Sequence, residues 1–285
     1  MSLEPKTVKV LEPRHSRLVR ITHWTNVISL CLLLMSGLQI FNAHPALYWG
    51  QAARFAQPWL ALTADRRADD SLVGYTEIGS ARFVTTGVLG ASRSNGVVVA
   101  RGFPALITLP GQRNLAIARN WHFFFAWLFA INGAIYLAGN LINGHLKRDL
   151  LPTKAQLAPR HIWADILEHI RLKFPKGPEA RHYNVLQKFA YLAVIAILLP
   201  GMILSGMTMS PALDAAFPWL LDLFTGRQSA RSIHFIFAML LVGFIGVHVA
   251  MVVLSGFWNN LRSMITGRFA IEHPAPPIAA KGDAT

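Results

Sequence analysis

The sequence is poor in charge and contains a single cysteine. Only 14% of its 285 residues are charged and 53% are hydrophobic, whereas soluble domains carry about 25% charged residues. Together with a mean hydropathy of +0.38, this indicates a membrane protein. The one cysteine, Cys31, cannot form an intrachain disulfide and lies in an apolar stretch, as expected of a small core residue. No Cys-X-X-Cys-His motif is present, so covalent attachment of a c-type haem is not expected.

Four apolar stretches are long enough to cross a bilayer core of roughly 30 Å, which takes about 20 helical residues. They predict an all-α integral membrane fold, a bundle of four transmembrane helices. The predicted helices cover residues 18–41, 119–142, 184–207 and 231–257. The first is not a cleaved signal sequence, because it lacks a small-residue cleavage site and contains Arg20, His23 and Trp24 in its opening turns.

The remaining segments differ in their basic residues. Every lysine lies in the N-terminus (1–17), the loop 143–183, the first turns of the third helix (Lys188) or the tail (258–285). By the positive-inside rule these segments are cytoplasmic, and residues 42–118 and 208–230 are periplasmic. We therefore expect a multi-pass protein of the bacterial inner membrane with both termini in the cytoplasm. The net charge of +13 then reflects orientation in membrane lipid and not a nucleic-acid partner.

Two connecting segments are predicted to carry structure of their own. In the periplasmic insertion 42–118, glycines alternate with β-prone runs from Val73 to Phe103, which predicts a short β-ribbon. In the cytoplasmic loop 143–183, a helix from Arg160 to Phe174 would place Trp163 on an apolar face and Asp165 outside it. Such a helix suits the membrane surface or packing against the bundle ends. The proline- and alanine-rich tail after Glu272 is predicted to be disordered.

Four histidines lie within the apolar spans: His23, His122, His234 and His248. Ionisable residues inside a membrane are costly and indicate function by default. His234 and His248 are fourteen residues apart, which is nearly four helical turns, so both project from one face about 21 Å apart. Counting depth pairs His122 with His234 near the outer surface and His23 with His248 near the inner one.

Opposed imidazoles at two depths predict two haems. A pair of histidines can complete the iron of a porphyrin that fills the centre of a helix bundle. Zinc or copper would require three or four clustered ligands. We therefore expect two non-covalent b-type haems, one between each pair of histidines. His44 and His145 are weaker ligand candidates, because each lies just beyond a span.

Arginines precede three of these histidines by three residues. Arg20, Arg119 and Arg231 each lie one turn closer to the membrane surface than His23, His122 and His234, on the same helix face. Haem propionates point towards that surface, and a guanidinium suits a carboxylate. The arginines are therefore candidate propionate partners, although arginines at helix ends also act as simple membrane anchors.

The segment Arg17-Leu-Val-Arg-Ile-Thr-His-Trp-Thr-Asn26 and the fourteen-residue spacing of His234 and His248 resemble the di-haem cytochrome b subunits of nickel hydrogenases and formate dehydrogenases. The segments 183–191 and 226–234 are closer to a branch of thiosulfate reductase cytochrome b subunits. The resemblance implies that His23, His122, His234 and His248 bind haem iron. It also implies a periplasmic molybdopterin-type oxidoreductase as partner.

These features predict an electron-transfer subunit that links the quinone pool to a periplasmic oxidoreductase. The insertion 42–118 would form the docking surface, a lid over the outer haem, or both. Quinone is expected near the inner haem, with Asn26, Gln187 and Tyr191 as candidate contacts. Two alternatives remain open: a self-contained haem enzyme acting on a small molecule at the outer haem, and a transporter whose histidines relay protons.

Overall fold

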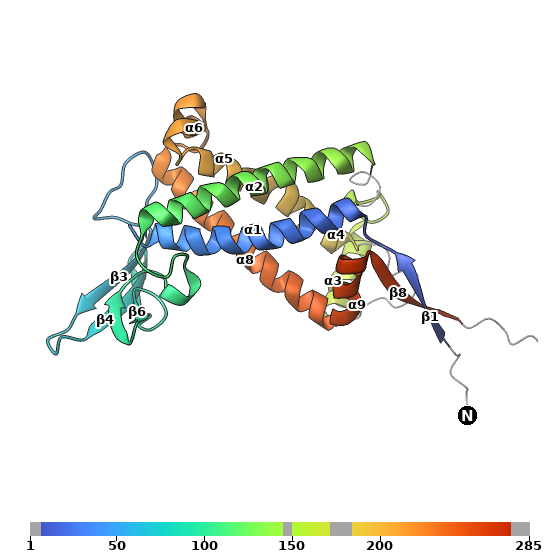
Figure 1. The fold of residues 1–285 in the computed structure, drawn as a ribbon, viewed down its shortest axis with the longest axis horizontal. Helices are drawn as coiled ribbons and strands as arrows, with labels where there is room; N and C mark the ends of the chain where they lie inside the picture. The colour runs from blue at the N-terminus through green and yellow to red at the C-terminus, as the bar shows by residue number, and fades with distance from the viewer. Residues whose placement is uncertain (1–6, 145–149, 172–183, 275–285) are drawn as a thin grey trace, which may run out of the picture. The chain divides into compact units, whose positions relative to one another are not determined.

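The structure is a computed structural model that describes residues 7–144, 150–171 and 184–274. It is mostly helical, and four of its helical segments are long and apolar enough to cross a membrane (Figure 1). These segments are α1 (Arg17–Phe41), α2 (Leu115–Ile142), α4–η4–α5 (Val185–Met207) and α8 (Arg227–Leu254). The prediction of four such helices is confirmed.

The third span is not a uniform helix. It consists of α4 (Val185–Ala193), a π-helical turn η4 (Val194–Leu198) and α5 (Leu199–Met207). Pro200 has no N–H to donate to the carbonyl four residues earlier, and its ring crowds that carbonyl. The wider turn η4 directly before α5 accommodates this loss, as π turns do inside longer helices.

The chain divides into two compact units, and each is described on its own. The larger unit comprises Thr22–Leu137 and Val194–Phe244. The smaller unit comprises Met1–Ile21, Ala138–Ala193 and Ile245–Thr285. In the larger unit α1 and α2 run side by side (Figure 1). They are joined by the Asn132 side chain, which donates to the Thr22 carbonyl at 2.8 Å and to Asn26 at 2.7 Å.

The larger unit also contains the β-rich segment, which we define as residues 42–114, and two short helices, α6 (Pro211–Ala216) and α7 (Trp219–Leu223). Four antiparallel strands pair in the order β2–β3–β4–β5, and β6 pairs with β7. The strands are β2 (Ala46–Leu47), β3 (Leu60–Arg66), β4 (Leu72–Ile78), β5 (Ala81–Val84), β6 (Ala91–Ser94) and β7 (Val97–Ala100). The 3₁₀ turn η1 (Ala105–Ile107) then leads towards α2.

Strands β5 to β7, and β4 apart from its first residue, fall inside the range for which the sequence predicts a β-ribbon, but the sheet begins earlier. Strand β3 pairs with β4 along its whole length, from Leu60 opposite Ile78 to Arg66 opposite Leu72. The sequence did not indicate it, because two of its seven residues are alanines, which have low β-propensity. Pairing with β4 and burial of Leu60 and Leu62 stabilise it instead.

An aromatic and aliphatic core attaches this segment to the helices. Phe41, the last residue of α1, packs its ring against Phe103 at 5.5 Å and against Phe235 of α8 at 5.0 Å between ring centres. The start of α8 is fixed as well, because the Gly50 carbonyl accepts hydrogen bonds from the amides of Gln228 and Ser229. Amides in the first turn of a helix have no partner within the helix. The β-rich segment therefore supplies hydrogen-bond acceptors to the first turn of α8.

A buried arginine holds the same segment to α1. The Arg101 side chain is 4% exposed, and its guanidinium donates to the carbonyls of Phe103 and Gly111. It also donates to Gln39 Oε1 and Thr108 Oγ1, each at 2.6 Å. All four acceptors are uncharged. A buried charge is tolerated only when its hydrogens are satisfied in this way.

In the smaller unit the two ends of the described chain pair with each other. Strand β1 (Thr7–Pro13) is antiparallel to β8 (Arg268–Pro274), and α9 (Phe257–Thr266) precedes β8. The sequence predicted only a tail here, because a two-stranded pairing between segments 255 residues apart leaves no local pattern. Residues 275–285, which include most of the tail predicted to be disordered, lie outside the described residues.

Helix α3 (Pro159–Ile170) covers most of the predicted amphipathic helix, whose last residues lie outside the described range. Asp165 and Trp163 of this helix lie in different surroundings. Asp165 is buried, and its carboxylate accepts a hydrogen bond from the Val185 amide at the start of α4. This amide has no partner within α4, and a carboxylate is favourable at a helix N-terminus. Trp163 is 62% exposed, and its placement at the membrane surface stays a prediction.

We expect Arg101→Ala to lower the free energy of unfolding by about 2–4 kcal/mol, because several buried acceptors lose their partner at once. Thermal unfolding of the purified protein in detergent measures this change. Arg93→Ala, at an exposed arginine of the same segment, is the matched control and should leave the unfolding temperature unchanged. Equal stability of the two variants would contradict a structural role for the Arg101 contacts.

Candidate functional site

The structure brings two of the four predicted ligand histidines together. His122 of α2 and His234 of α8 face each other in the larger unit, with 6.3 Å between ring centres and 63° between ring planes. His23 lies in the same unit, where its ring meets Trp24 edge to face at 5.5 Å. His248 belongs to the smaller unit. The pairing of His23 with His248 therefore stays a prediction.

Each facing imidazole is held from behind by a serine of a neighbouring helix. Ser36 Oγ of α1 lies 3.1 Å from His122 Nδ1, and Ser205 Oγ of α5 lies 3.0 Å from His234 Nδ1. Both serines are fully buried. The two contacts bind α1 to α2 and α5 to α8 at the level of the histidine pair.

The distances around each serine hydroxyl indicate which nitrogen of the facing ring carries hydrogen. Ser36 Oγ donates to the Leu32 carbonyl at 2.6 Å, and Ser205 Oγ donates to the Gly201 carbonyl at 2.6 Å. A hydroxyl has one proton, and a carbonyl oxygen can only accept. Each serine oxygen must therefore accept from Nδ1–H. Nε2 of both imidazoles is then left with a free lone pair, which is the form that binds a metal.

Each serine hydroxyl also lies within hydrogen-bonding distance of a second carbonyl of its own helix. Ser36 Oγ is 3.2 Å from the Leu33 carbonyl, and Ser205 Oγ is 3.3 Å from the Met202 carbonyl. In α1 and in α5 this carbonyl is three residues before the serine. Both serines are thus held in the same way, with their protons directed to the backbone of their own helix.

A glycine follows each serine and lets the ring approach. A Cβ atom on Gly37 would lie 3.3 Å from Cε1 of His122, and one on Gly206 would lie 3.3 Å from Cε1 of His234. Both separations are tighter than ordinary van der Waals contact. A side chain at either position would push the imidazole away from the helix behind it.

This donor set fits a haem iron with two axial ligands. Two imidazoles that share one metal ion through bonds of about 2 Å have ring centres roughly 6 Å apart, which matches the observed pair. Within the described part of the chain, no three or more His, Cys, Asp or Glu side chains gather as a metal site. Two neutral nitrogens, opposed in an apolar surrounding, suit a planar group that supplies the other four ligands.

The sequence model described as prokaryotic cytochrome b561 matches residues 14–267 of the chain. The chain belongs to this family. Membership implies a b-type haem and identifies a cytochrome b membrane subunit, and it confirms the resemblance found from the sequence motifs.

A relative of this cytochrome b comes from Azospira oryzae. It is 32% identical over 253 residues, which is 89% of this chain and 96% of the relative. It is provisionally named protein-methionine-sulfoxide reductase subunit YedZ1, whereas the sequence motifs were closest to thiosulfate reductase subunits. No solved structure matches the chain.

Two of the predicted propionate arginines of the cytochrome b are found near the histidine pair. Arg231, one turn before His234, donates to the His44 carbonyl and lies 5.6 Å above the ring of Phe41. Arg119, one turn before His122, is exposed and lies 5.6 Å above the ring of Phe123. Both guanidinium groups are at the end of the unit that holds the β-rich segment.

The third arginine, Arg20, makes its contacts inside the smaller unit. Its guanidinium donates to the Ile265 carbonyl in the last turn of α9. A cation at a helix C-terminus is favourable, because the unpaired carbonyls there carry partial negative charge. In the described structure Arg20 thus anchors α9.

His44, a weaker ligand candidate, is engaged elsewhere. Its Nε2 lies 3.1 Å from the Tyr48 hydroxyl, and the two rings stack 5.6 Å apart. Burial first, and then the charge of Arg231, lower the pKa of the His44 imidazole from its ordinary value. His145, the other weaker candidate, lies outside the described residues.

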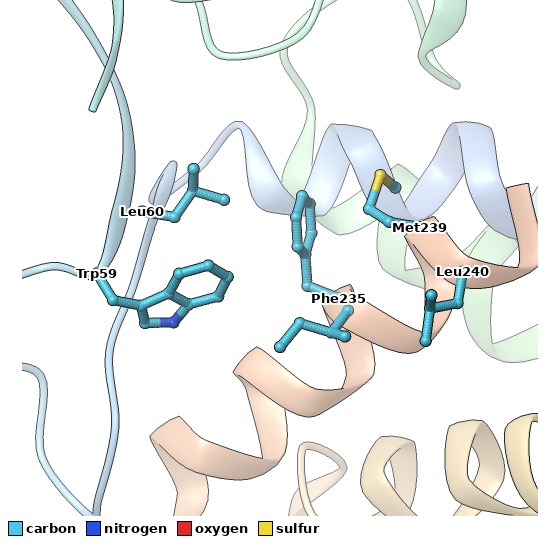
Figure 2. A pocket seen from close by; sticks show the side chains of 6 residues that line it. Trp59, Leu60, Phe235, Met239 and Leu240 are labelled. Carbon is cyan, nitrogen blue, oxygen red and sulfur yellow. The ribbon is translucent and has the colours of Figure 1, made fainter. Parts of the chain in front are cut away.

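An apolar pocket of about 310 Å³ lies between the start of β3 and α8. Its lining is shown in Figure 2 and consists of Trp59, Leu60, Phe235, Ile236, Met239 and Leu240. The only polar side-chain hydrogen in this lining belongs to Trp59, whose Nε1 already donates to Ser232 Oγ at 2.9 Å. The pocket therefore suits a hydrocarbon chain better than the carbonyl oxygens of a quinone ring.

Two of the candidate quinone contacts have other partners. Asn26 accepts the hydrogen bond from Asn132 that joins α1 to α2. Gln187 and Asn184 form reciprocal hydrogen bonds at the start of α4, where each side chain accepts from the other's backbone amide. This arrangement is a helix cap. Tyr191, the third candidate, lies in α4.

The sequence reasoning missed the two serines and the two glycines. The available signal was a Ser-Gly dipeptide inside the first span, Ser36-Gly37, and another inside the third, Ser205-Gly206. Each dipeptide on its own is an ordinary pair of small residues in a membrane helix. Only contact with a histidine of the next helix gives it a role.

If His122 and His234 bind one haem, His122→Ala and His234→Ala should each lose the same haem from this cytochrome b. The double variant should then lose no more haem than either single variant, because one missing axial ligand already removes the group. Counting haem per polypeptide in the purified proteins measures this.

His44→Ala is the control and should retain full haem content. His23→Ala is expected to retain the haem at His122 and lose a different one. Additive loss in the double variant of His122 and His234 would contradict their sharing a single iron.

Proposed function

We propose that this cytochrome b is the membrane electron-transfer subunit of a two-component oxidoreductase. It relays electrons between the quinone pool and a periplasmic molybdopterin-type partner. The observation that carries the proposal is the pair of neutral imidazoles facing each other within the membrane-spanning helices, in a chain of the prokaryotic cytochrome b561 family. The self-contained haem enzyme remains the alternative outcome of the test below.

In this proposal two b-type haems lie at different depths in the bacterial inner membrane. His122 and His234 hold the outer haem, and His23 and His248 hold the inner one. The fourteen residues between His234 and His248 correspond to about 21 Å along one helix, so both haems share α8 as a common support. When bound, the two haems supply one-electron carriers across the bilayer.

The protein contributes position and surroundings. The serines fix the hydrogen-bearing nitrogen of the outer ligands, and Phe235 and Met239 of α8 pack against the apolar core of the larger unit. In this proposal the haem has no covalent link to the protein and lies in surroundings of low polarity. Its reduction potential then depends on its histidine ligands and on its burial. Arg231 and Arg119 lie at the end of the site where haem propionates would emerge.

The β-rich segment is the proposed docking surface on the periplasmic side. Arg54, Arg67 and Arg93 are exposed on it. Other arginines of the segment are already paired: Arg66 with Asp70 at 2.7 Å, and Arg82 with Asp65 and Glu77. The exposed cations suit an acidic surface on the partner, since complementary charge speeds association.

The name of the relative suggests what the partner reduces. We propose that the partner of this chain reduces methionine sulfoxide in proteins. One sulfoxide takes two electrons and two protons and gives methionine and water. One quinol supplies both electrons, which cross this subunit one at a time. The substrate is thus bound by the partner, and this chain delivers the electrons.

Purification of the tagged full-length chain from native membranes tests the proposal. A molybdopterin-containing protein should co-purify and be identified by mass spectrometry. The reduced cytochrome should be reoxidised by methionine sulfoxide only when that partner is present. Reoxidation by the small molecule without a partner would establish the self-contained enzyme instead. A haem-loaded chain that never co-purifies with a redox protein would overturn the proposal.

Reversing the exposed charges tests the docking surface separately. The triple variant Arg54→Glu, Arg67→Glu, Arg93→Glu should weaken binding of the purified partner about tenfold or more at low salt, with a smaller loss at high salt. Its haem content should stay unchanged. Arg171→Glu, an exposed charge reversal after α3, is the matched control and should bind the partner normally. If the unchanged chain, the triple variant and Arg171→Glu all bind the partner equally well, the partner docks on another surface.

A further inference from the structure

The two Ser-Gly dipeptides occupy matching positions in two helix pairs. In the first pair, α1 carries Ser36-Gly37 and α2 carries His122. In the second, α5 carries Ser205-Gly206 and α8 carries His234. The serine–imidazole distances are 3.1 and 3.0 Å, and the glycine Cβ separations are 3.3 Å in both. The larger unit thus contains the same arrangement twice: a Ser-Gly dipeptide of one helix behind a histidine of its neighbour. We call each arrangement a histidine seat.

Serines in membrane helices commonly donate to the carbonyl four residues earlier without any further role. A third serine of this chain shows that more is involved here. Ser29 lies on α1 two turns before Ser36 and is equally buried, but its hydroxyl has no hydrogen-bond partner among the described residues. The hydrogen-bonded geometry therefore belongs to the serines behind the histidines and not to every buried serine of the helix.

We propose that Ser36 and Ser205 are positioning residues that act equally on the two axial ligands and together lower the reduction potential of the outer haem. The proposal rests on the proposed binding of that haem by His122 and His234. It goes beyond it, because it assigns a function to side chains that do not touch the haem.

The physical reason is the direction of the two hydrogen bonds at each serine. The hydroxyl gives its proton to a carbonyl, which makes its oxygen a better acceptor for the imidazole N–H. An acceptor at Nδ1–H raises the basicity of the ligating nitrogen and keeps the ring oriented. A more basic ligand stabilises the more highly charged, oxidised iron. Removing the hydroxyl should therefore raise the reduction potential.

The symmetry of the seats makes a quantitative expectation possible. Ser36 and Ser205 act through ligands on opposite sides of one iron. Their effects on the potential should therefore be similar in size and roughly additive. A shift of about 59 mV corresponds to a tenfold change in the ratio of affinities for the oxidised and the reduced state.

The test is a redox titration of the purified full-length chain and of Ser36→Ala, Ser205→Ala and the double variant, followed by absorption spectroscopy. Each single variant should raise the potential of one haem, the double variant should raise it about twice as far, and the other haem should not shift. Ser36→Thr and Ser205→Thr keep a hydroxyl on Cβ and should restore the original potential. Ser29→Ala is the matched control and should change nothing at the outer haem.

Unchanged potentials in both alanine variants with full haem content would overturn the proposal. If the alanine variants lose the outer haem, the threonine variants decide: retained haem supports positioning through the hydroxyl, and equal loss shows that the serines only fill space. Failure of the underlying site is distinguishable, because His122→Ala would then leave the haem content unchanged whatever the serine variants do.

Discussion

In the apolar interior of a membrane, a polar hydrogen without an acceptor is costly, and this cost organises the site. The Nδ1–H groups of His122 and His234 are satisfied by Ser36 and Ser205, and the serine protons by backbone carbonyls. Unsatisfied groups there would each cost several kcal/mol. The same hydrogen bonds join neighbouring helices and leave Nε2 of each ring free for iron.

The site and the β-rich segment are connected along α1. Gln39 lies one turn after Ser36, and its side chain accepts a hydrogen bond from the buried Arg101. The β-rich segment, which is the proposed docking surface, is therefore attached to α1 one turn from the serine that contacts His122. A partner bound to that surface would rest on the part of α1 that positions the outer ligand, which suits short electron transfer between partner and haem.

The irregular third span, α4–η4–α5, carries the serine and glycine that contact His234. Gly201 and Met202, whose carbonyls accept hydrogen bonds from the Ser205 hydroxyl, directly follow Pro200. The π turn η4 lies directly before α5, next to these residues. Gly201 has no side chain, which leaves room for Phe237 of α8 to pack against it. Backbone deformation and a missing Cβ thus bring α5 close to α8.

The sequence alone determined the four apolar spans, the histidines within them and the family, because hydropathy and the spacing of fourteen are properties of a single helix. It also indicated β4 to β7, where glycines separate β-prone runs. Strand β3, the β1–β8 pairing and the buried side of Asp165 depended on partners distant in the chain. Only the tertiary structure decided that Ser36 and Ser205 meet His122 and His234, because a hydrogen bond between helices depends on their packing and leaves no pattern in either one.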